Sequence, residues 1–154
     1  MIPISEILTP SHVNLALAAT DQAAGVDEVL SKLNGDPRIL DWEALKQSIT
    51  ERNAPAISCG TCGLCIAHGR TNAVQSLVMA AGRSSAGLSS PHVKEPVRLV
   101  FVAGIPAAFH SEYLRVVGAI ARLCNDKVLL SELLSVQDPE KFISLLSSGE
   151  TKLA

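Results

Sequence analysis

The sequence predicts a layered α/β domain with a small mixed sheet, and three observations support this prediction. Apolar residues make up 47% of the 154 residues and charged residues 18%, which is enough apolar material for one buried core. One Trp, one Tyr and three Phe are the only aromatic residues, so the core must be aliphatic, as is typical of helices packed on a sheet. Strand-like and helix-like segments alternate early, and helices dominate late. The length fits a single domain over residues 1–154.

The first third of the chain reads as a strand followed by two helices. Residues 13–17 alternate in polarity, which predicts a short strand. Residues 21–33 keep the apolar spacing of a helix and open on Asp21, a residue that caps helix N-termini well. Residues 41–53 repeat this pattern, and that helix must end before Pro55, which cannot continue it.

The middle of the chain predicts further strands joined by loops. Residues 54–72 are small and contain glycines, and they are expected to form a loop that leads into a short strand over 64–67. Residues 73–81 and 97–104 are apolar enough for buried strands. The Ser- and Gly-rich residues 82–95 between them are expected to form a loop or hairpin connection.

Helices are predicted to close the chain. Residues 110–124 place apolar side chains at the i, i+3 and i+4 spacing of an amphipathic helix. Two shorter helices are expected over residues 127–134 and 139–146. The second of them opens on Asp138-Pro139, a capping residue followed by proline at the first helical position.

Charge and hydropathy argue against several classes of function. The net charge is −2 and the basic residues are dispersed, whereas nucleic-acid binding needs a concentrated positive face. The most apolar stretch, residues 99–109, is half as long as the ~20 residues of a membrane-spanning helix, so no membrane insertion is expected. The N-terminus lacks the features of a secretory signal, so we expect a cytoplasmic protein with reduced cysteines.

The first candidate for chemistry is His68, at the end of an apolar strand. A strand end holds a side chain rigidly, and neutral imidazole is a nucleophile that can carry a phosphoryl group. Gly69 is expected to leave room for a tetrahedral group. Ser58, Thr61 and Gly63 offer hydroxyl and backbone donors to its oxygens. A histidine at a strand end is also commonly structural, so this signal alone is weak.

Two further pairs of residues are candidates to support a charged group at His68. Glu51-Arg52 closes the second helix, and an arginine offers a planar donor fork to a phosphoryl group. His110 and Tyr113 share one face at the start of the 110–124 helix, where the N-terminus attracts anions. The alternative interpretation of both pairs is that they are solvated surface residues.

A second interpretation of the same region is a metal or cluster site. Cys59, Cys62, Cys65 and His68 recur at every third residue, and three thiolates with an imidazole are a plausible zinc set. Against this, all four ligands lie in one run, and Cys65 and His68 would point to opposite faces of an extended strand. Cysteine as a small apolar core residue is the simpler interpretation, with no metal or cofactor.

Several segments occur in an order and spacing that match a known family. They are residues 4–10, Glu51-Arg52, residues 63–70 around His68, residues 95–101, and the amphipathic helix over 114–123. Together they resemble the mannitol/fructose and nitrogen-regulatory class of enzyme IIA domains, from the bacterial phosphoenolpyruvate-dependent phosphotransferase system. The resemblance runs nearly end to end.

The resemblance implies a three-layer α/β/α sandwich with a small mixed β-sheet, and a phosphoryl carrier. His68 falls on the family's phosphorylated histidine, and Arg52 on its phosphoryl-stabilising arginine. The implied donor is an HPr-like phosphocarrier protein, and the implied acceptor is a IIB-type domain or a regulated protein target. Because the sequence shows no IIB or membrane segment, a regulatory or shared-carrier role is expected.

The chain departs from the family pattern at three places, which leaves two alternatives open. Ala67 replaces a proline before the histidine, and Thr61-Cys62-Gly63 replaces a Gly-Asn-Gly turn. Tyr113 replaces a second histidine near the phosphoryl site; it can donate a hydrogen bond but cannot carry positive charge. His110 is the other candidate for that role. The alternatives are a non-phosphorylated IIA-like docking or regulatory module, and a metal- or cluster-binding variant.

Overall fold

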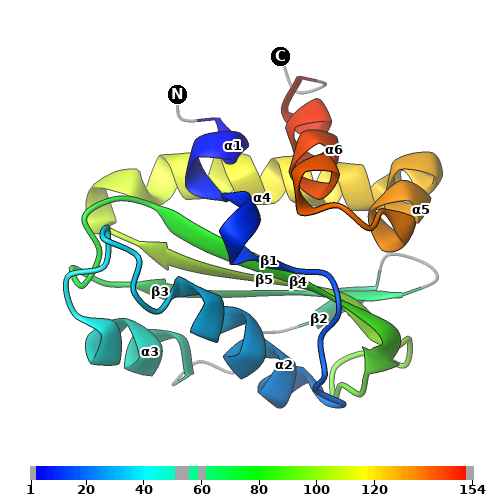
Figure 1. Cartoon of the computed structure of the whole chain (residues 1–154), viewed down its shortest axis with the longest axis horizontal. Coiled ribbons are helices and arrows are strands. Elements are labelled where there is room, and N and C mark those ends of the chain that lie inside the picture. The colour runs from blue at the N-terminus through cyan, green and yellow to red at the C-terminus, as the bar shows by residue number, and fades with distance from the viewer. Residues whose placement is uncertain (1–2, 51–55, 59–61, 152–154) are drawn as a thin grey trace.

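The computed structural model describes residues 3–50, 56–58 and 62–151, and in it five strands form one mixed sheet (Figure 1). The strand order is β1-β4-β5-β3-β2. The pairs β1–β4 and β3–β5 are parallel, and the pairs β4–β5 and β2–β3 are antiparallel. The strands are β1 (Val13–Asn14), β2 (Ala56–Ser58), β3 (Gly63–Arg70), β4 (Val78–Leu88) and β5 (Val97–Ile105).

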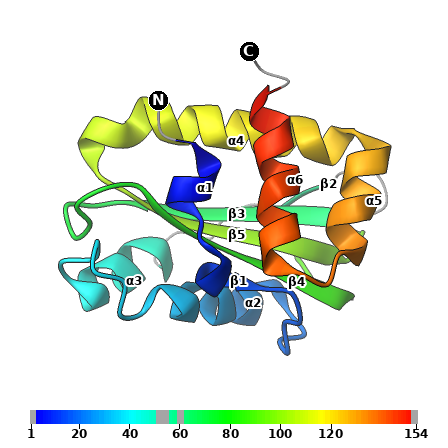
Figure 2. The same cartoon turned by 45° about the horizontal axis from the view of Figure 1, so that its top comes forward.

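Helices cover both faces of this sheet, which confirms the three-layer α/β/α sandwich (Figures 1 and 2). One face carries α1 (Ile4–Ile7), α4 (His110–Asn125), α5 (Lys127–Ser135) and α6 (Pro139–Thr151). The other face carries α2 (Gln22–Leu30) and α3 (Trp42–Thr50). Short 3-10 turns complete the described elements: η1 (Pro10–His12), η2 (Ser31–Leu33) and η3 (Ala107–Phe109).

The central strands supply two hydrophobic cores, one under each helical layer. Leu99 and Phe101 of β5 pack toward α4 and α6, whereas Val100 and Val102 pack toward α2 and α3. All four side chains are completely buried, which explains why the strand is a continuous apolar run. Burial of each such side chain contributes roughly 1.5–3 kcal/mol. No helix of the described residues is long and apolar enough to cross a membrane.

The helix starts predicted from capping residues are confirmed. The Asp21 carboxylate accepts a hydrogen bond from the Ala24 amide at 2.9 Å, and the Asp41 carboxylate accepts one from the Ala44 amide at 3.1 Å. At the start of α6, Asp138 accepts one from the Glu140 amide at 3.0 Å.

The strands differ from the prediction in extent: β1 ends at Asn14 rather than at residue 17, and β3 covers Gly63–Arg70 rather than 64–67. β4 runs from Val78 to Leu88, so the strand predicted over residues 73–81 begins five residues later, and the loop or hairpin connection predicted over 82–95 is strand in its first half. Gly82 reads as a loop residue, but a Cβ there would lie 2.4 Å from a methyl group of Val29 on α2. The glycine therefore marks close packing of a helix rather than a turn. The short β2 was also not predicted, and α1, with four residues, is too short to show a helical period.

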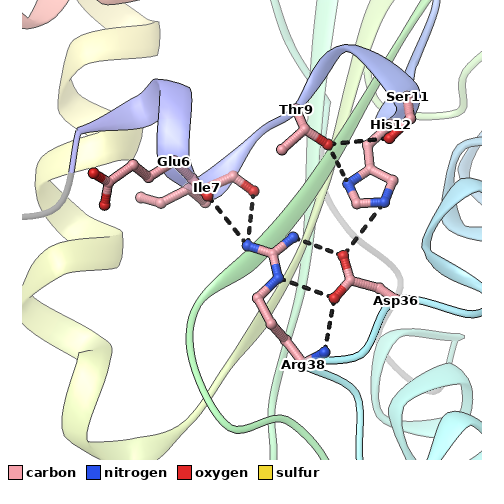
Figure 3. Close-up of polar contacts among 7 residues, drawn as sticks. All are labelled: Glu6, Ile7, Thr9, Ser11, His12, Asp36 and Arg38. Atoms are coloured by element: carbon pink, nitrogen blue, oxygen red, sulfur yellow. Dashed lines mark hydrogen bonds and ion pairs between the residues drawn. The ribbon is translucent and has the colours of Figure 1, made fainter.

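A buried polar cluster fastens the segment before β1 to the loop between α2 and α3 (Figure 3). Asp36 Oδ2 lies 2.7 Å from Arg38 Nη2 and 3.4 Å from His12 Nε2, and the Thr9 hydroxyl lies 3.2 Å from His12 Nδ1. Arg38 also donates to two carbonyl oxygens at the end of α1. The side chains of His12 and Asp36 are 11% and 4% exposed, so the cluster is largely shielded from water.

Candidate functional site

Strand β3 places His68 on the face of the sheet that α4 covers. Leu64 of β3 belongs to the core under α4, and Cys65 and Ala67 belong to the core under α2 and α3. Because successive strand residues point to opposite faces, His68 shares the face of Leu64. Its register partner on β5 is Ala103, which belongs to the same core. The His68 residue itself is half-buried.

Helix α4 brings Tyr113 against His68. The two ring centroids lie 5.1 Å apart, and the ring planes are tilted by 41°. Tyr113 is 5% exposed, and burial raises the pKa of its hydroxyl to about 12. The hydroxyl is therefore neutral at any physiological pH.

Gly69 serves a different purpose from the one expected. A Cβ at this position would lie 2.2 Å from Ser48 Oγ and 2.9 Å from Ser48 Cβ on α3. Gly69 thus lies against the opposite helical layer from His68, because the strand continues to Arg70 and alternates in direction. The expectation that it leaves room for a phosphoryl group is wrong. Its role is to let α3 approach the sheet.

Ser58 of β2 and Gly63 of β3 lie at the end of the β2–β3 pair that is far from His68. They are register partners of each other in the β2–β3 pair. Gly63 is five residues from His68 along an extended strand, which is roughly 16 Å. The Gly63 amide donates to the carbonyl oxygen of Pro96 at 2.8 Å, so this amide is already occupied. The structure therefore does not bring Ser58 and Gly63 to His68.

Of the remaining supporting candidates, His110 lies among the described residues, whereas Arg52 and Thr61 do not. His110 is half-buried at the start of α4, and its Nδ1 atom is buried with no hydrogen-bond partner among the described residues. Arg52 and Thr61 lie outside the described residues. The described residues that flank Arg52 are Thr50, at the end of α3, and Ala56, the register partner of Cys65.

The cysteines are placed on both sides of the sheet. Cys62 belongs to the core under α4, and Cys65 to the opposite core, where its sulfur accepts a hydrogen bond from Gln22 Nε2 at 3.5 Å. Burial raises the pKa of the Cys65 thiol to about 11, which disfavours a thiolate ligand. Cys59 lies outside the described residues. Within the described ranges, no group of three or more His, Cys, Asp or Glu side chains could hold a metal ion.

Residues 6–149 match the sequence profile of the family described as "Phosphoenolpyruvate-dependent sugar phosphotransferase system, EIIA 2". The chain belongs to this family. The resemblance seen in the sequence motifs is thereby confirmed, and it fits the fold described above.

The chain matches nearly the full length of one relative and about a quarter of the length of another. The PTS system fructose-specific EIIA component of Haloferax volcanii is 25% identical over 145 residues, which is 94% of each chain. The PTS system fructose-specific EIIABC component of Bacillus subtilis is 22% identical over 148 residues. That match covers 96% of this chain and 23% of the longer protein.

Two solved structures share the fold. Nitrogen regulatory protein IIA-Ntr from Neisseria meningitidis superimposes with a TM-score of 0.79 at 23% identity, covering 93% of this chain and 98% of that one. Enzyme IIAMTL from Escherichia coli, solved in complex with phosphorylated enzyme IIBMTL, gives a TM-score of 0.73 at 13% identity. That match covers 90% of this chain and 95% of the other.

Proposed function

We propose that this protein is a phosphoryl carrier that accepts a phosphoryl group on His68 and passes it to a IIB-type acceptor. The observation that carries the proposal is the placement of His68 in a member of the EIIA 2 family. Its imidazole is half-buried on β3, beside the small Ala103 and against the ring of Tyr113. A neutral imidazole held in this way is a suitable nucleophile for phosphorus.

Arg52 is proposed as the residue that stabilises the transferred group. A guanidinium offers two parallel N–H donors to phosphoryl oxygens, and it stays charged at any physiological pH. Support comes from the sequence motif and from the described residues on either side of Arg52. One of them, Ala56, pairs with Cys65, only three residues before His68.

The proposed donor is an HPr-like phosphocarrier protein, and the proposed acceptor is a IIB-type domain or a regulated protein target. The IIB-type acceptor is suggested by the complex of enzyme IIAMTL with phosphorylated enzyme IIBMTL. Both relatives named above are fructose-specific components, and IIA-Ntr is a nitrogen regulatory protein. The phosphoryl group on this chain would serve either sugar phosphorylation through a IIB-type domain or regulation of a target protein. In both cases the exchange with the partner would take place in the cytoplasm.

A carrier role is favoured over the two alternatives. A metal or cluster site would need ligands that converge, but Cys65 lies in the core on the opposite face of the sheet from His68. A docking module without phosphorylation would not need a nucleophile beside a buried phenol. A docking role alone does not explain why His68 is packed against the ring of Tyr113.

The proposal is tested by incubating the protein with phosphoenolpyruvate, enzyme I and an HPr-like carrier, and measuring its intact mass. We expect a gain of one phosphoryl group that is labile in acid and stable in base, because phosphoimidazoles behave in this way. His68→Ala should abolish the gain. The matched control is His92→Ala, because His92 is an exposed histidine outside the site.

His12 is unsuitable as a control because it is buried in the cluster of Figure 3. A mass gain that persists in His68→Ala, or no gain under conditions that phosphorylate a known IIA domain, would contradict the proposal.

A further inference from the structure

Arg83 is a buried cation whose hydrogen bonds are only partly satisfied. It lies on β4 opposite Leu99 of β5, so its side chain enters the core under α4, and the residue is 3% exposed. Its Nη1 atom donates to the carbonyl oxygens of Leu133 and Val136 at the end of α5. Each guanidinium nitrogen carries a donor, yet Nε is buried with no hydrogen-bond partner among the described residues. The Nε edge of Arg83 therefore lacks an acceptor.

A second guanidinium lies beside this one. Arg98 Nε donates to the carbonyl oxygen of Ser84, the residue that follows Arg83, at 3.2 Å. Desolvation lowers the pKa of Arg83, and the positive charge of Arg98 lowers it further. Arg98 is half-buried, so the pair is reachable from solvent on the Arg98 side. The two side chains together concentrate positive charge at the edge of a core.

No carboxylate compensates this charge. Among the described residues, neither Arg83 nor Arg98 forms an ion pair with an Asp or Glu side chain. Glu95, three residues before Arg98, and Glu132, next to Leu133, are thus not its counter-ions. The carbonyl oxygens at the end of α5 supply only a partial negative charge. A buried cation beside another cation is costly unless an anion offsets the charge, so the pair favours an anion from solution.

We propose that Arg83 and Arg98 form a binding site for a phosphate-type oxyanion, which accepts hydrogen bonds from the Nε edge of Arg83 and from the Arg98 guanidinium. The planar donor fork of arginine matches the spacing of phosphate oxygens. A phosphate monoester carries a charge of about −1.5 to −2 near pH 7, which balances two guanidinium groups. A carboxylate carries a single charge and would leave one of the two cations uncompensated.

This anion site is separate from His68. Arg83 lies four residues along β4 from Met79. Met79 is opposite Ala103 of β5, which is the register partner of His68. The two sites are therefore roughly 13 Å apart along the strands. One phosphoryl group cannot contact both, so the inference adds a second anion to the molecule and does not depend on the function proposed above.

The test follows the binding of inorganic phosphate at pH 7.5, with sodium chloride holding the ionic strength constant. We expect a saturable rise in melting temperature and saturable shifts of the Nε–Hε NMR signals of Arg83 and Arg98. Arg98→Met should weaken binding by about 10- to 100-fold, because it removes a charged donor. Arg122→Met, which removes an exposed arginine from α4, is the matched control and should bind normally. His68→Ala should also bind like the wild type.

Three further ligands identify the class of anion. Sulfate, which has the same shape and a double charge, should compete with phosphate, whereas acetate should bind about 10-fold more weakly or worse. Glycerol phosphate distinguishes the sources of the phosphate group: binding as tight as that of inorganic phosphate identifies an organic phosphate ester, and much weaker binding identifies the free ion. Equal effects of phosphate on Arg98→Met and Arg122→Met, or a rise in melting temperature that sodium chloride reproduces, would show general charge screening and overturn the inference.

Discussion

Gly69 and His68 are neighbours in sequence, but they serve opposite layers of the molecule. His68 lies under α4, and Gly69 touches Ser48 of α3. Any residue larger than glycine at position 69 would push α3 away from β3. The position of His68 therefore also depends on packing against the opposite face of the sheet. Because β3 is covered by helices on both faces, a change in packing under α3 also affects His68 under α4.

Gly69→Ala should accordingly destabilise the protein by about 1–3 kcal/mol, because the new methyl group overlaps the Ser48 side chain and α3 must shift. Chemical denaturation measures the loss. Gly118→Ala on α4 is the matched control, since nothing lies within 4 Å of a Cβ there. As a helical glycine it should gain up to about 1 kcal/mol instead. Equal effects of the two substitutions would show that the Ser48 contact is unimportant.

At the scale of elements, the sequence predicted best where one physical signal dominates. The continuous apolar run of β5 indicated a strand, and Asp21 and Asp41 indicated helix starts that their hydrogen bonds in the structure confirm. The second half of β4 was missed because its polar residues are satisfied by distant elements. Arg83, for example, is 3% exposed and would not be assigned to a core strand.

The features of the site that depend on local geometry were predicted, and those that depend on contacts with distant segments were not. Strand alternation correctly placed Cys65 and His68 on opposite faces, since that depends only on local geometry. The Gly63 amide was assigned to the phosphoryl group because its actual acceptor, the Pro96 carbonyl, lies on a segment far away in sequence. Contacts of that kind carry no local pattern.

Arg83 joins β4 to the end of α5, and this link supports a prediction at the same scale. Arg83 Nη1 donates to the carbonyl oxygens of Leu133 at 3.1 Å and Val136 at 2.5 Å, which are orphan acceptors at a helix C-terminus. Arg83→Met keeps the length of the side chain but leaves both carbonyls unpaired. We expect a loss of about 2–3 kcal/mol in the free energy of unfolding.

Arg98→Met provides the comparison for this prediction. Arg98 is half-buried and its Nε donates to one carbonyl oxygen, that of Ser84, so its loss should cost about 1 kcal/mol or less. Urea denaturation of both variants gives the two values. Stability that is unchanged in Arg83→Met would mean that the cost of burying the guanidinium cancels its hydrogen bonds.

At the scale of the whole molecule, the cluster of His12, Asp36 and Arg38 links the two helical layers around the β1 edge of the sheet (Figures 1 and 3). Desolvation lowers the pKa of His12, and this effect outweighs the attraction of Asp36, while Arg38 and Lys32 lower it further. The hydrogen bonds from Arg38 lower the pKa of Asp36. Both groups thus bind protons less readily in the folded chain than in the unfolded one.

The sign of the resulting pH dependence follows from linkage. Where the unfolded chain binds more protons than the folded chain, stability falls as the pH is lowered. His12 should contribute a loss that begins as the pH falls through about 6.5, the ordinary value for histidine, and Asp36 a further loss below about 4. Urea unfolding at pH 7.5 and 5.5 measures the first step. The His12→Gln variant should show a smaller decrease than the wild type, because it has no ring to protonate, whereas the exposed His92→Gln should behave like the wild type. A decrease of equal size in His12→Gln would assign the pH dependence to other groups, and the cluster would then be a pH-independent fastening between the layers.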